Sequence, residues 1–542
     1  MTNNDLVYLV NAGNDEGMAS MSNDYSFPAL GILALGTWLQ KRMPDLDVIA
    51  RDGAIRTTEQ IQEEIARLNP AIMGISTLCT SYQNSLKIAK TAKDSGAKVV
   101  LGNDQASQTS RLILEHQPNV DYVIGAEYGE LPLEMLVRHI RDRQIPLDKI
   151  PSLTFRHDGK VVGFDYERDK CKLSLRNQES GYSGIVLEHG LRSNNRDILD
   201  IFPIVNRNLY PEDHWKRYLA NYLSKFAELH LSPETLSELK KKYPNWLDEE
   251  NPDYNRYTQE AISLASKIVT GVTTMNRARG CSRKGSDVCK HCDITGVRIG
   301  EISMSSPEIF WEEVRTAHDQ VKATSFYEAC DSFSSFPELI KRIVKARPSN
   351  LKFNPEFYVY AQAIDLAEHP ERVDMLKEMG VFRVNMGLES MSDKTLKHMK
   401  GERDSVKHNE RALQLCKDRN IKVYGSFVLG SEAETPETLR ETTERVCDLL
   451  NDGYLCDAEA QPVLPLAGNY QGEVLRRHGL IYDNPLHPDH PVNVDDSSKI
   501  FINRFSGVRH EECIESTKTI RAKAKKCRKN CGSGVSLEKN YK

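Results

Sequence analysis

The sequence lacks the features that mark membrane proteins and secreted, disulfide-stabilised proteins. Its opening segment, MTNNDLVYLVNAGNDEG, has no basic stretch followed by a long apolar one, so no signal peptide is expected. No uncharged apolar run approaches the roughly 20 residues that a transmembrane helix needs. We therefore expect a cytoplasmic protein, without a membrane partner, whose cysteines are free thiols or metal ligands.

An excess of charge of one sign is also missing. The 542 residues include 72 Lys and Arg against 77 Asp and Glu, a net charge of −5, and aromatic residues make up 7%. Without a clear basic module, nucleic acid is not expected as a partner. The basic stretch RAKAKKCRKN near the C-terminus is interpreted as a solvated tail. The hydrophobic content of 39% is enough for ordinary folded cores.

Residues 1–150 alternate between short apolar runs and longer helical patterns. This alternation predicts a doubly wound, Rossmann-like α/β domain with a parallel sheet between two layers of helices. Ligands of such domains bind at the carboxyl ends of the strands. The expected strands are LVYLV (6–10), DVIA (47–50), AIMGIST (71–77), KVVLG (98–102) and DYVIG (121–125).

Residues 151–262 are less regular and are interpreted as a connector with a helical insert. SLTFRHDGKVVGF is typical of a hairpin that turns at Asp158-Gly159. In the charged stretch that follows, Ser232 and Pro233 are suited to cap and open a helix. A lid over the next domain is the alternative interpretation of this region.

The alternation returns over residues 263–475. Helices that open at SPEIFWEEV and TPETLRETTERV have Ser306 or Thr435 as a cap and proline as the next residue. Six such units predict a partial (β/α)6 barrel of the TIM type, with its chemistry at the carboxyl ends of the strands. Residues 476–542 are expected to form a C-terminal extension. The expected barrel strands are KIVTGVTTM, SFYEAC, NLKFN, VFRVNMGLE, KVYGSFVLG and AEAQPVLPL.

Three of the twelve cysteines lie in one short stretch, RGCSRKGSDVCKHCDI, shortly after the first barrel strand. Cys281, Cys289 and Cys292 are spaced C-x7-C-x2-C, and no fourth cysteine is near. Structural zinc prefers four closed ligands, and His291 is the candidate for the fourth, although adjacent residues in a tight turn point apart. A 4Fe–4S cluster on three thiolates would leave one iron open. The spacing alone leaves both metals open.

Motifs at several strand ends resemble those of the radical S-adenosylmethionine (SAM) superfamily, in the branch with an N-terminal cobalamin-binding-type domain. The resemblance covers most of residues 5–145 and 265–470, and the motifs occur in the family's order. They are Arg279-Gly280-Cys281, the stretch from Glu328 to Phe333, Gly387-Leu388-Glu389-Ser390, and Gly430 with Glu434-Thr435 beyond it.

The resemblance implies a role for the three cysteines. Cys281, Cys289 and Cys292 would hold a 4Fe–4S cluster whose open iron binds SAM. An electron from a donor such as flavodoxin or ferredoxin would then drive cleavage of a carbon–sulfur bond of SAM.

The resemblance also implies the residues that bind SAM. Glu389 and Ser390 would hold the ribose, since a carboxylate accepts hydrogen bonds from hydroxyl groups. Asp331 or Glu328 would take the methionyl ammonium group. The full implied set is Glu328, Asp331, Gly387, Glu389, Ser390 and Gly430.

The cysteine spacing departs from the family's usual C-x3-C-x2-C. The added residues could loop out, because extra loop length costs little entropy. They could instead place Arg283 or Lys284 beside the cluster and favour an anionic ligand. The outcome of bond cleavage is therefore left open.

The loops MGISTLCTS (73–81) and LGNDQAS (101–107) resemble those that approach the corrinoid in this branch, and Thr77, Gly102 and Asn103 are the implied contacts. Asn103 and Asp104 replace an expected glycine and its neighbour, where glycine would let the backbone approach most closely. No Asp-x-His-x-x-Gly occurs, so that motif offers no histidine to cobalt. The alternatives are a cobalamin-binding domain and a retained but empty one.

Three functions follow. The leading hypothesis is a radical SAM enzyme that methylates a small molecule through cobalamin. A second enzyme would work without cobalamin and transfer the 3-amino-3-carboxypropyl group of SAM to a soft acceptor such as trivalent arsenic, which a thiol such as Cys330 could hold. The third is a non-enzymatic, zinc-stapled corrinoid- or ligand-binding protein.

Overall fold

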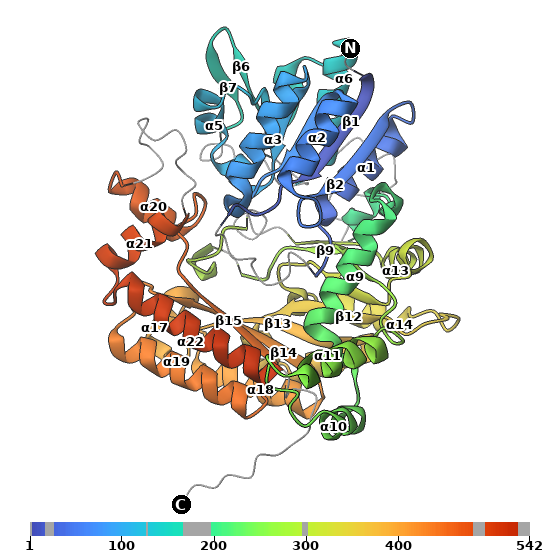
Figure 1. The fold of residues 1–542 in the computed structure, drawn as a ribbon. Helices are drawn as coiled ribbons and strands as arrows, with labels where there is room; N and C mark the ends of the chain where they lie inside the picture. The colour runs from blue at the N-terminus through green and yellow to red at the C-terminus, as the bar shows by residue number, and fades with distance from the viewer. Residues whose placement is uncertain are drawn as a thin grey trace, which may run out of the picture. The chain divides into compact units, whose positions relative to one another are not determined.

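The chain folds into two compact units, each built from three segments (Figure 1). The cysteine stretch belongs to the first unit, although it directly follows a strand of the second. The first unit comprises Met1–His214, Asn276–Thr316 and Leu464–Ser497, and the second comprises Trp215–Met275, Ala317–Val463 and Ser498–Lys542. The computed structural model describes residues 3–16, 26–125, 128–165, 197–283, 285–294, 302–480 and 494–528.

A seven-stranded sheet organises the first unit. Its strands are β1 (Asn3–Asn11), β2 (Asp47–Asp52), β3 (Pro70–Ser76), β4 (Lys98–Gly102), β5 (Tyr122–Ile124), β6 (Leu153–His157) and β7 (Lys160–Gly163). The order is β2-β1-β3-β4-β5-β6-β7, with the first five strands parallel and the last two antiparallel. The order 2-1-3-4-5 is that of a doubly wound domain, so the predicted fold class is confirmed here.

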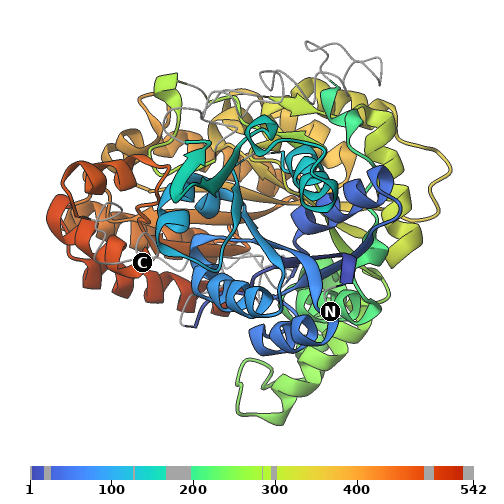
Figure 2. The ribbon, with the colours of Figure 1, turned by 90° about the horizontal axis from the view of Figure 1, so that it is seen from above.

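Helices cover both faces of this sheet (Figure 1, Figure 2). Tyr8 packs with Ile65 and Ile88 on one face. Leu9, the next residue, lies against Gly36 on the opposite face, as the alternation of side chains along a strand requires. The helices between and after its strands are α1 (Leu30–Arg42), α2 (Thr58–Leu68), α3 (Tyr82–Asp94), α4 (Asp104–Gln108), α5 (Ser110–His116) and α6 (Glu130–Asp142). A further helix of this unit, α20 (Tyr470–Arg477), comes from its third segment.

Two antiparallel ribbons complete the first unit. Asp158 and Gly159 form the turn of the β6–β7 hairpin with φ of 48° and 73°, as expected for a two-residue hairpin turn. The other ribbon pairs β9 (Ala278–Arg279) with β10 (Ser303–Met304). It pairs Arg279, the first residue of the cysteine stretch, with Ser303, which lies beyond the end of that stretch.

A six-stranded, fully parallel sheet organises the second unit. Its strands are β8 (Val272–Met275), β11 (Ser325–Glu328), β12 (Glu356–Ala361), β13 (Val381–Glu389), β14 (Lys422–Leu429) and β15 (Asp457–Pro462). They lie in chain order, with β8 and β15 at the edges. Sequential parallel strands joined by helices form the partial barrel that the sequence predicts.

Two helices of the second unit, α10 and α19, begin at the caps read from the sequence. The Thr435 hydroxyl accepts a hydrogen bond from the Thr438 amide, and the Ser232 hydroxyl accepts one from the Thr235 amide. The helices of this unit are α10 (Pro233–Lys242), α11 (Pro252–Ala265), α14 (Pro337–Lys345), α15 (Ala363–Glu368), α16 (Pro370–Met379), α17 (Asp393–Lys400), α18 (Val406–Asp418), α19 (Pro436–Asn451) and α22 (His510–Arg528). Three further helices cross the unit boundaries: α9 (Glu212–Phe226), α13 (Pro307–Val321) and α21 (Val494–Phe505).

Two strand predictions were wrong in detail. NLKFN is not a strand, and β12 starts at Glu356 instead; the Phe353 ring stacks on His318 with centroids 3.8 Å apart, which explains an apolar residue there. The strand expected from Ile268 begins only at Val272, because the preceding residues form the turn that ends α11. No helix within the described ranges is long and apolar enough to cross a membrane.

Candidate functional site

The carboxyl end of β13 carries the motif Gly387-Leu388-Glu389-Ser390. Glu389 is buried and has a left-handed backbone with φ of 61°, a conformation that is uncommon outside glycine, asparagine and aspartate. The pairing with β14 shifts register between Gly387 and Glu389, so the strand is irregular at this point. Strained non-glycine residues of this kind persist only where the surrounding structure supports them.

Two buried side chains from the helices after β13 supply that support. The Lys400 ammonium donates a hydrogen bond to the carbonyl oxygen of Gly387 at 2.6 Å. The Asn409 amide donates one to the carbonyl oxygen of Leu388 at 3.1 Å. Sequence analysis missed both residues, because a helical pattern does not separate a polar side chain that turns inward from a solvated one. Each lies on the buried face of its helix, α17 or α18, and this burial is apparent only in the folded structure.

The Glu389 carboxylate lies back over Gly387. A Cβ atom on residue 387 would be 2.3 Å from Glu389 Oε1, so this approach requires glycine. Lys400 Nζ is 3.9 Å from Asp404 Oδ1 as well. The end of β13 therefore combines carboxylates and an ammonium group in buried surroundings, and a carboxylate here can accept hydrogen bonds from ligand hydroxyls.

Ser390 uses its hydroxyl within the fold. The hydroxyl lies 3.0 Å from Thr442 Oγ1 and accepts a hydrogen bond from the Ser392 amide at 3.1 Å. These contacts join the turn after β13 to α19. The predicted ribose contact of Ser390 stays a prediction, and a ribose would compete with these bonds.

The two candidate ammonium ligands lie at the end of β11. Glu328 is its last residue and is fully buried, whereas Asp331 is half-buried in the turn that follows. The pKa of Tyr327 is raised well above its ordinary value, first by burial and then by neighbouring groups that include Asp331. Because β11, β12 and β13 run parallel, Glu328 and Glu389, the last residues of β11 and β13, lie at the same carboxyl end of the sheet.

Gly430 follows β14, and packing alone explains its identity. Its φ is 87°, and a Cβ atom there would be 2.7 Å from Ile502 Cδ1 and 3.1 Å from Cys513 Sγ. Its amide donates to Glu434 Oε2 at 3.3 Å, and burial raises the pKa of that carboxyl. A contact with SAM is not needed to account for this glycine and stays a prediction.

The cysteine loop starts from the β9–β10 ribbon in the first unit. Cys281 is buried, whereas Cys289 and Cys292 are half-buried and share a tight turn in which the Cys292 amide donates to the Cys289 carbonyl oxygen at 3.0 Å. The Asn469 amide donates to the His291 carbonyl oxygen at 3.3 Å. The backbone of the second half of the loop is therefore held by the segment before α20.

The three cysteine thiols are suitable ligands for a metal, but in this structure their sulfur atoms are not gathered around a common point. Within the described ranges no three His, Cys, Asp or Glu side chains come together as ligands. The described cysteines are free thiols. Three thiols on one loop fit a cluster of soft metal ions chemically. Lys284 and residues 295–301 of the loop lie outside the described residues, and Arg283 donates to the Asp287 carbonyl oxygen at 3.5 Å.

Thr77 and Gly102 lie at the carboxyl edge of the seven-stranded sheet. The Thr77 amide donates to the Gly102 carbonyl oxygen at 3.0 Å. The Thr77 hydroxyl is completely buried and has no hydrogen-bond partner within the described ranges. A buried polar atom without a partner costs about 1–3 kcal/mol, so a ligand group at this strand end would satisfy it.

Asn103 closes the loop after β4 with its own side chain. Its φ is 78° and its ψ is 175°, a backbone region that is almost restricted to glycine. Its Oδ1 accepts a hydrogen bond from the Asp104 amide at 2.8 Å, and its Nδ2 donates one to Ser76 Oγ at 3.0 Å. The chain thus has glycine-like backbone here, as the resemblance implies, but keeps a side chain. The Thr77 hydroxyl could bond to a corrinoid, whereas the Asn103 side chain takes up space that a glycine would leave for the corrinoid to approach the backbone.

Two family profiles match the chain. The radical SAM superfamily matches residues 275–446, and the B12 binding domain matches residues 22–137. The first match includes all three loop cysteines and the motifs of β11, β13 and β14. The second includes Thr77, Gly102 and Asn103. Both parts of the resemblance drawn from the sequence are confirmed.

A curated relative and two solved structures extend the comparison. A 90-residue segment is 29% identical to the anaerobic magnesium-protoporphyrin IX monomethyl ester cyclase of Rubrivivax gelatinosus, and this match spans 17% of the chain and 16% of the relative. The fold is similar to the radical SAM methyltransferase TsrM from Kitasatospora setae, solved with cobalamin and a 4Fe–4S cluster, with a TM-score of 0.58 and 16% identity over 90% of this chain and 80% of that one. It is also similar to the cobalamin-dependent SAM radical enzyme OxsB, solved with aqua-cobalamin and SAM, with a TM-score of 0.53 and 16% identity over 93% of this chain and 57% of that one. At this identity the two structures establish the fold.

Proposed function

Because this chain belongs to the radical SAM superfamily and carries a B12-binding domain ahead of its radical SAM domain, we propose that it transfers a SAM-derived group to a small molecule. The observation that carries the proposal is the pairing of these two domains with three cysteines on the loop that follows the first barrel strand. The preferred reaction is methylation through cobalamin. The TsrM structure with bound tryptophan and a SAM analogue supports a small-molecule acceptor by analogy of fold.

The residues at the cysteine loop fit a cluster by their chemistry. Cys281, Cys289 and Cys292 would hold it, and when bound it supplies the electron that cleaves SAM, delivered by a partner such as flavodoxin or ferredoxin. The short Cys289–Cys292 turn and the buried position of Cys281 would shield the site from solvent.

Glu389 is the residue that we assign to SAM with most support. Its carboxylate is buried, sits at the carboxyl end of a barrel strand, and belongs to a backbone bulge that Lys400 and Asn409 hold in place. Such a carboxylate would accept hydrogen bonds from the two ribose hydroxyls. Glu328 is the better-buried candidate for the ammonium group, and Asp331 is the more accessible one.

The B12-binding domain favours methylation. Thr77 offers a buried hydroxyl to a ligand, and cobalamin, when bound, would supply a carrier for the methyl group. The side chain of Asn103 favours the second candidate, transfer of the aminocarboxypropyl group without cobalamin, because it occupies the place of a glycine. Cys330 is completely buried, which argues against it as the holder of an arsenic acceptor.

Anaerobic purification followed by iron, cobalt and zinc analysis tests the proposal. We expect iron and sulfide in equal amounts and SAM cleavage in wild-type protein. Cys281→Ala should abolish both, whereas Cys447→Ala, which removes a half-buried thiol of α19, should retain both. Stoichiometric zinc without iron would overturn the proposal in favour of a zinc-stapled binding protein.

Product analysis separates the two enzyme candidates. 5′-Deoxyadenosine together with S-adenosylhomocysteine indicates radical methylation through cobalamin. Methylthioadenosine without bound cobalt indicates aminocarboxypropyl transfer. We expect the first result.

A further inference from the structure

Arg279 connects the cysteine loop to an aromatic pair in the first unit. It is the last residue of β9, two positions before Cys281. Its guanidinium carbon lies 4.6 Å from the centre of the Tyr128 ring and 5.7 Å from that of Phe202. The two rings are themselves stacked, with centroids 5.6 Å apart and planes inclined by 7°. Arginine over aromatic faces is a favourable contact, and more so away from water.

Tyr128 belongs to the loop between β5 and α6, at the carboxyl edge of the B12-type sheet. Its ring is completely buried. Glu130, two residues further on, is also buried; burial raises its pKa, and the positive charge of Arg279 opposes this shift. The Tyr128 ring of the loop after β5 therefore contacts Arg279, and the buried Glu130 carboxyl at the start of α6 lies within the field of its charge.

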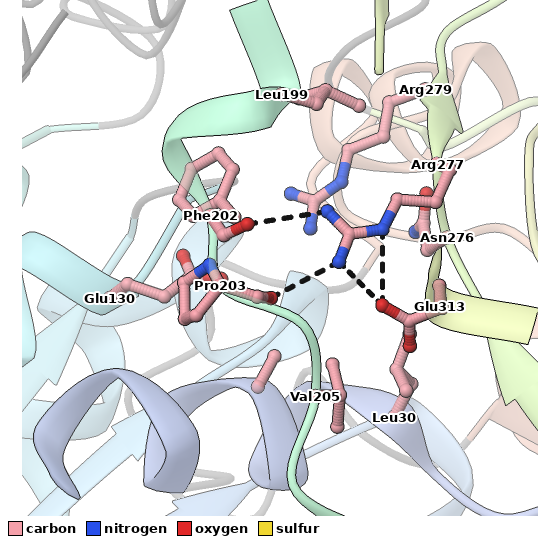
Figure 3. A pocket seen from close by; sticks show the side chains of 11 residues that line it. Leu30, Glu130, Leu199, Phe202, Pro203, Val205, Asn276, Arg277, Arg279 and Glu313 are labelled. Atoms are coloured by element: carbon pink, nitrogen blue, oxygen red, sulfur yellow. Dashed lines mark hydrogen bonds and ion pairs between the residues drawn. The ribbon is translucent and has the colours of Figure 1, made fainter. Parts of the chain in front are cut away.

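Arg277, which directly precedes β9, makes different contacts. It donates to Glu313 and to the carbonyl oxygens of Phe202 and Pro203, at 3.3 and 3.1 Å for the carbonyls. Figure 3 shows these bonds, and it shows Arg279 and Glu130 lining the same pocket. The Arg277 guanidinium is held by hydrogen bonds to Glu313 and to two backbone carbonyls, whereas the Arg279 guanidinium lies over a ring of the loop after β5.

A second contact joins the other half of the cysteine loop to the loop after β4. Gln108, the last residue of α4, donates to the carbonyl oxygen of Asp293 at 3.4 Å. Asp293 directly follows Cys292, and α4 is the helix that Asn103 caps. The cysteine loop therefore contacts the loop after β5 through Arg279 and the helix after β4 through Asp293, and both lie at the carboxyl edge of the sheet, where ligands of doubly wound domains bind.

We infer that Arg279 and Tyr128 couple the binding of cobalamin to the retention of the iron–sulfur cluster. This inference rests on the proposed function. A ligand at the carboxyl edge of the sheet that contacts Tyr128 would hold its ring in place, and that ring lies over Arg279, from which the cysteine loop departs. Coupling between two sites is reciprocal, so the cluster tightens cobalamin by the same factor by which cobalamin tightens the cluster. Arg279 is a positioning residue in this arrangement.

The test measures cobalamin affinity in two states of the full chain. Hydroxocobalamin is titrated anaerobically into protein with a reconstituted cluster and into chelator-stripped protein, with binding followed by absorbance. In wild type we expect at least about a fivefold tighter dissociation constant when the cluster is present, the lower end of typical couplings. In Tyr128→Leu the ratio should fall to about one while each cofactor still binds.

Three further variants serve as controls and as a second test of the coupling. Tyr128→Phe preserves the stack and should preserve the ratio. Arg279→Lys keeps the charge but loses the planar stacking group, so it should lower the ratio even where Tyr128→Leu proves poorly folded. Arg138→Gln removes an α6 arginine that pairs with Glu134 instead, and should leave the ratio unchanged.

The outcomes separate this inference from the function on which it rests. A wild-type ratio of one, with both cofactors bound, overturns the coupling and leaves the proposed function standing. An unchanged ratio in both Tyr128→Leu and Arg279→Lys overturns the assignment to these residues. Failure of cobalamin to bind in either state overturns the coupling together with the proposal of methylation through cobalamin.

Discussion

The carboxyl ends of β13 and β4 each carry a non-glycine residue with positive φ, but the two residues are stabilised in different ways. Glu389 and Asn103 both have positive φ, at 61° and 78°. The bulge at Glu389 is held by Lys400 and Asn409, two side chains from later helices. The turn at Asn103 is held by the Asn103 amide itself, through Ser76 and the next backbone amide. A strained residue supported by its neighbours can present its side chain to a ligand, whereas one that supports itself cannot do so without losing that support.

Substituting Glu389 should give the largest effect of the comparison. Glu389→Ala should weaken SAM binding by about 1.5–3 kcal/mol, the value of a hydrogen-bonding group that carries charge, and leave the iron content intact. Glu389→Gly should weaken binding equally. Its free energy of unfolding should exceed that of the alanine variant by about 1 kcal/mol, and it should melt at a higher temperature, because glycine accepts positive φ. Calorimetric titration of SAM and thermal melts provide the measurements.

Glu402→Ala is the matched control, since this glutamate is exposed beyond α17. It should change neither quantity. If Glu389→Ala bound SAM as tightly as wild type, Glu389 would be a structural strand-end residue and the contrast with Asn103 would disappear.

Gly387→Ala displaces the same carboxylate without deleting it. The new Cβ atom would sit 2.3 Å from Glu389 Oε1, so the side chain must move away. We expect SAM affinity to fall about tenfold, which is about 1.4 kcal/mol. Gly31→Ala, at a helical position with open space around it, is the control and should leave affinity unchanged. Wild-type affinity in Gly387→Ala would mean that the present carboxylate position does not matter for SAM.

Asn103 offers the parallel experiment in the first unit. Asn103→Gly should be more stable than Asn103→Ala by about 1–2 kcal/mol, because alanine keeps the strained backbone and loses both side-chain bonds. The glycine variant should also retain cobalamin more tightly, by opening the approach to the loop after β4. Thermal melts and cobalt counting after gel filtration measure the two effects. Equal cobalt retention in all three proteins would exclude Asn103 from the corrinoid contact.

The smallest effect is expected at Thr77. Thr77→Val removes a buried hydroxyl that lacks a partner within the described ranges, so the cofactor-free protein should become slightly more stable, by about 1 kcal/mol. Cobalamin should bind more weakly by about 0.5–1.5 kcal/mol, the net value of one hydrogen bond. Thr77→Ser, which keeps the hydroxyl, should bind like wild type. A valine variant with unweakened cobalamin binding would contradict the assignment of Thr77 as a ligand contact.

The local sequence pattern predicted the elements whose structure depends on residues within the same segment. KVVLG and VFRVNMGLE match β4 and β13 to the residue, and Thr435 caps α19 with the predicted proline after it. Strand periodicity and capping depend on neighbours a few positions apart, and these are visible in a single sequence. The same holds for the cysteine spacing and the strand-end motifs, which identified the superfamily.

Contacts between distant segments were not visible in that pattern. The apolar Leu351 and Phe353 suggested a strand, but Phe353 is apolar because it stacks on His318, and the strand lies further on at Glu356–Ala361. Nothing local marks Lys400 and Asn409 as the supports of Glu389.

The sequence by itself determined the two α/β domains, their order, and the residue types available for cofactors. Only the tertiary structure decided that the cysteine loop packs with the B12-type domain, through Arg279 on Tyr128 and Asp293 on Gln108. It also decided that Glu389 and Asn103 share a strained backbone with different supports. The physical reason is that each segment encodes its own periodicity of burial. The packing of the segments decides which side chains meet when they are more than a hundred residues apart in the sequence.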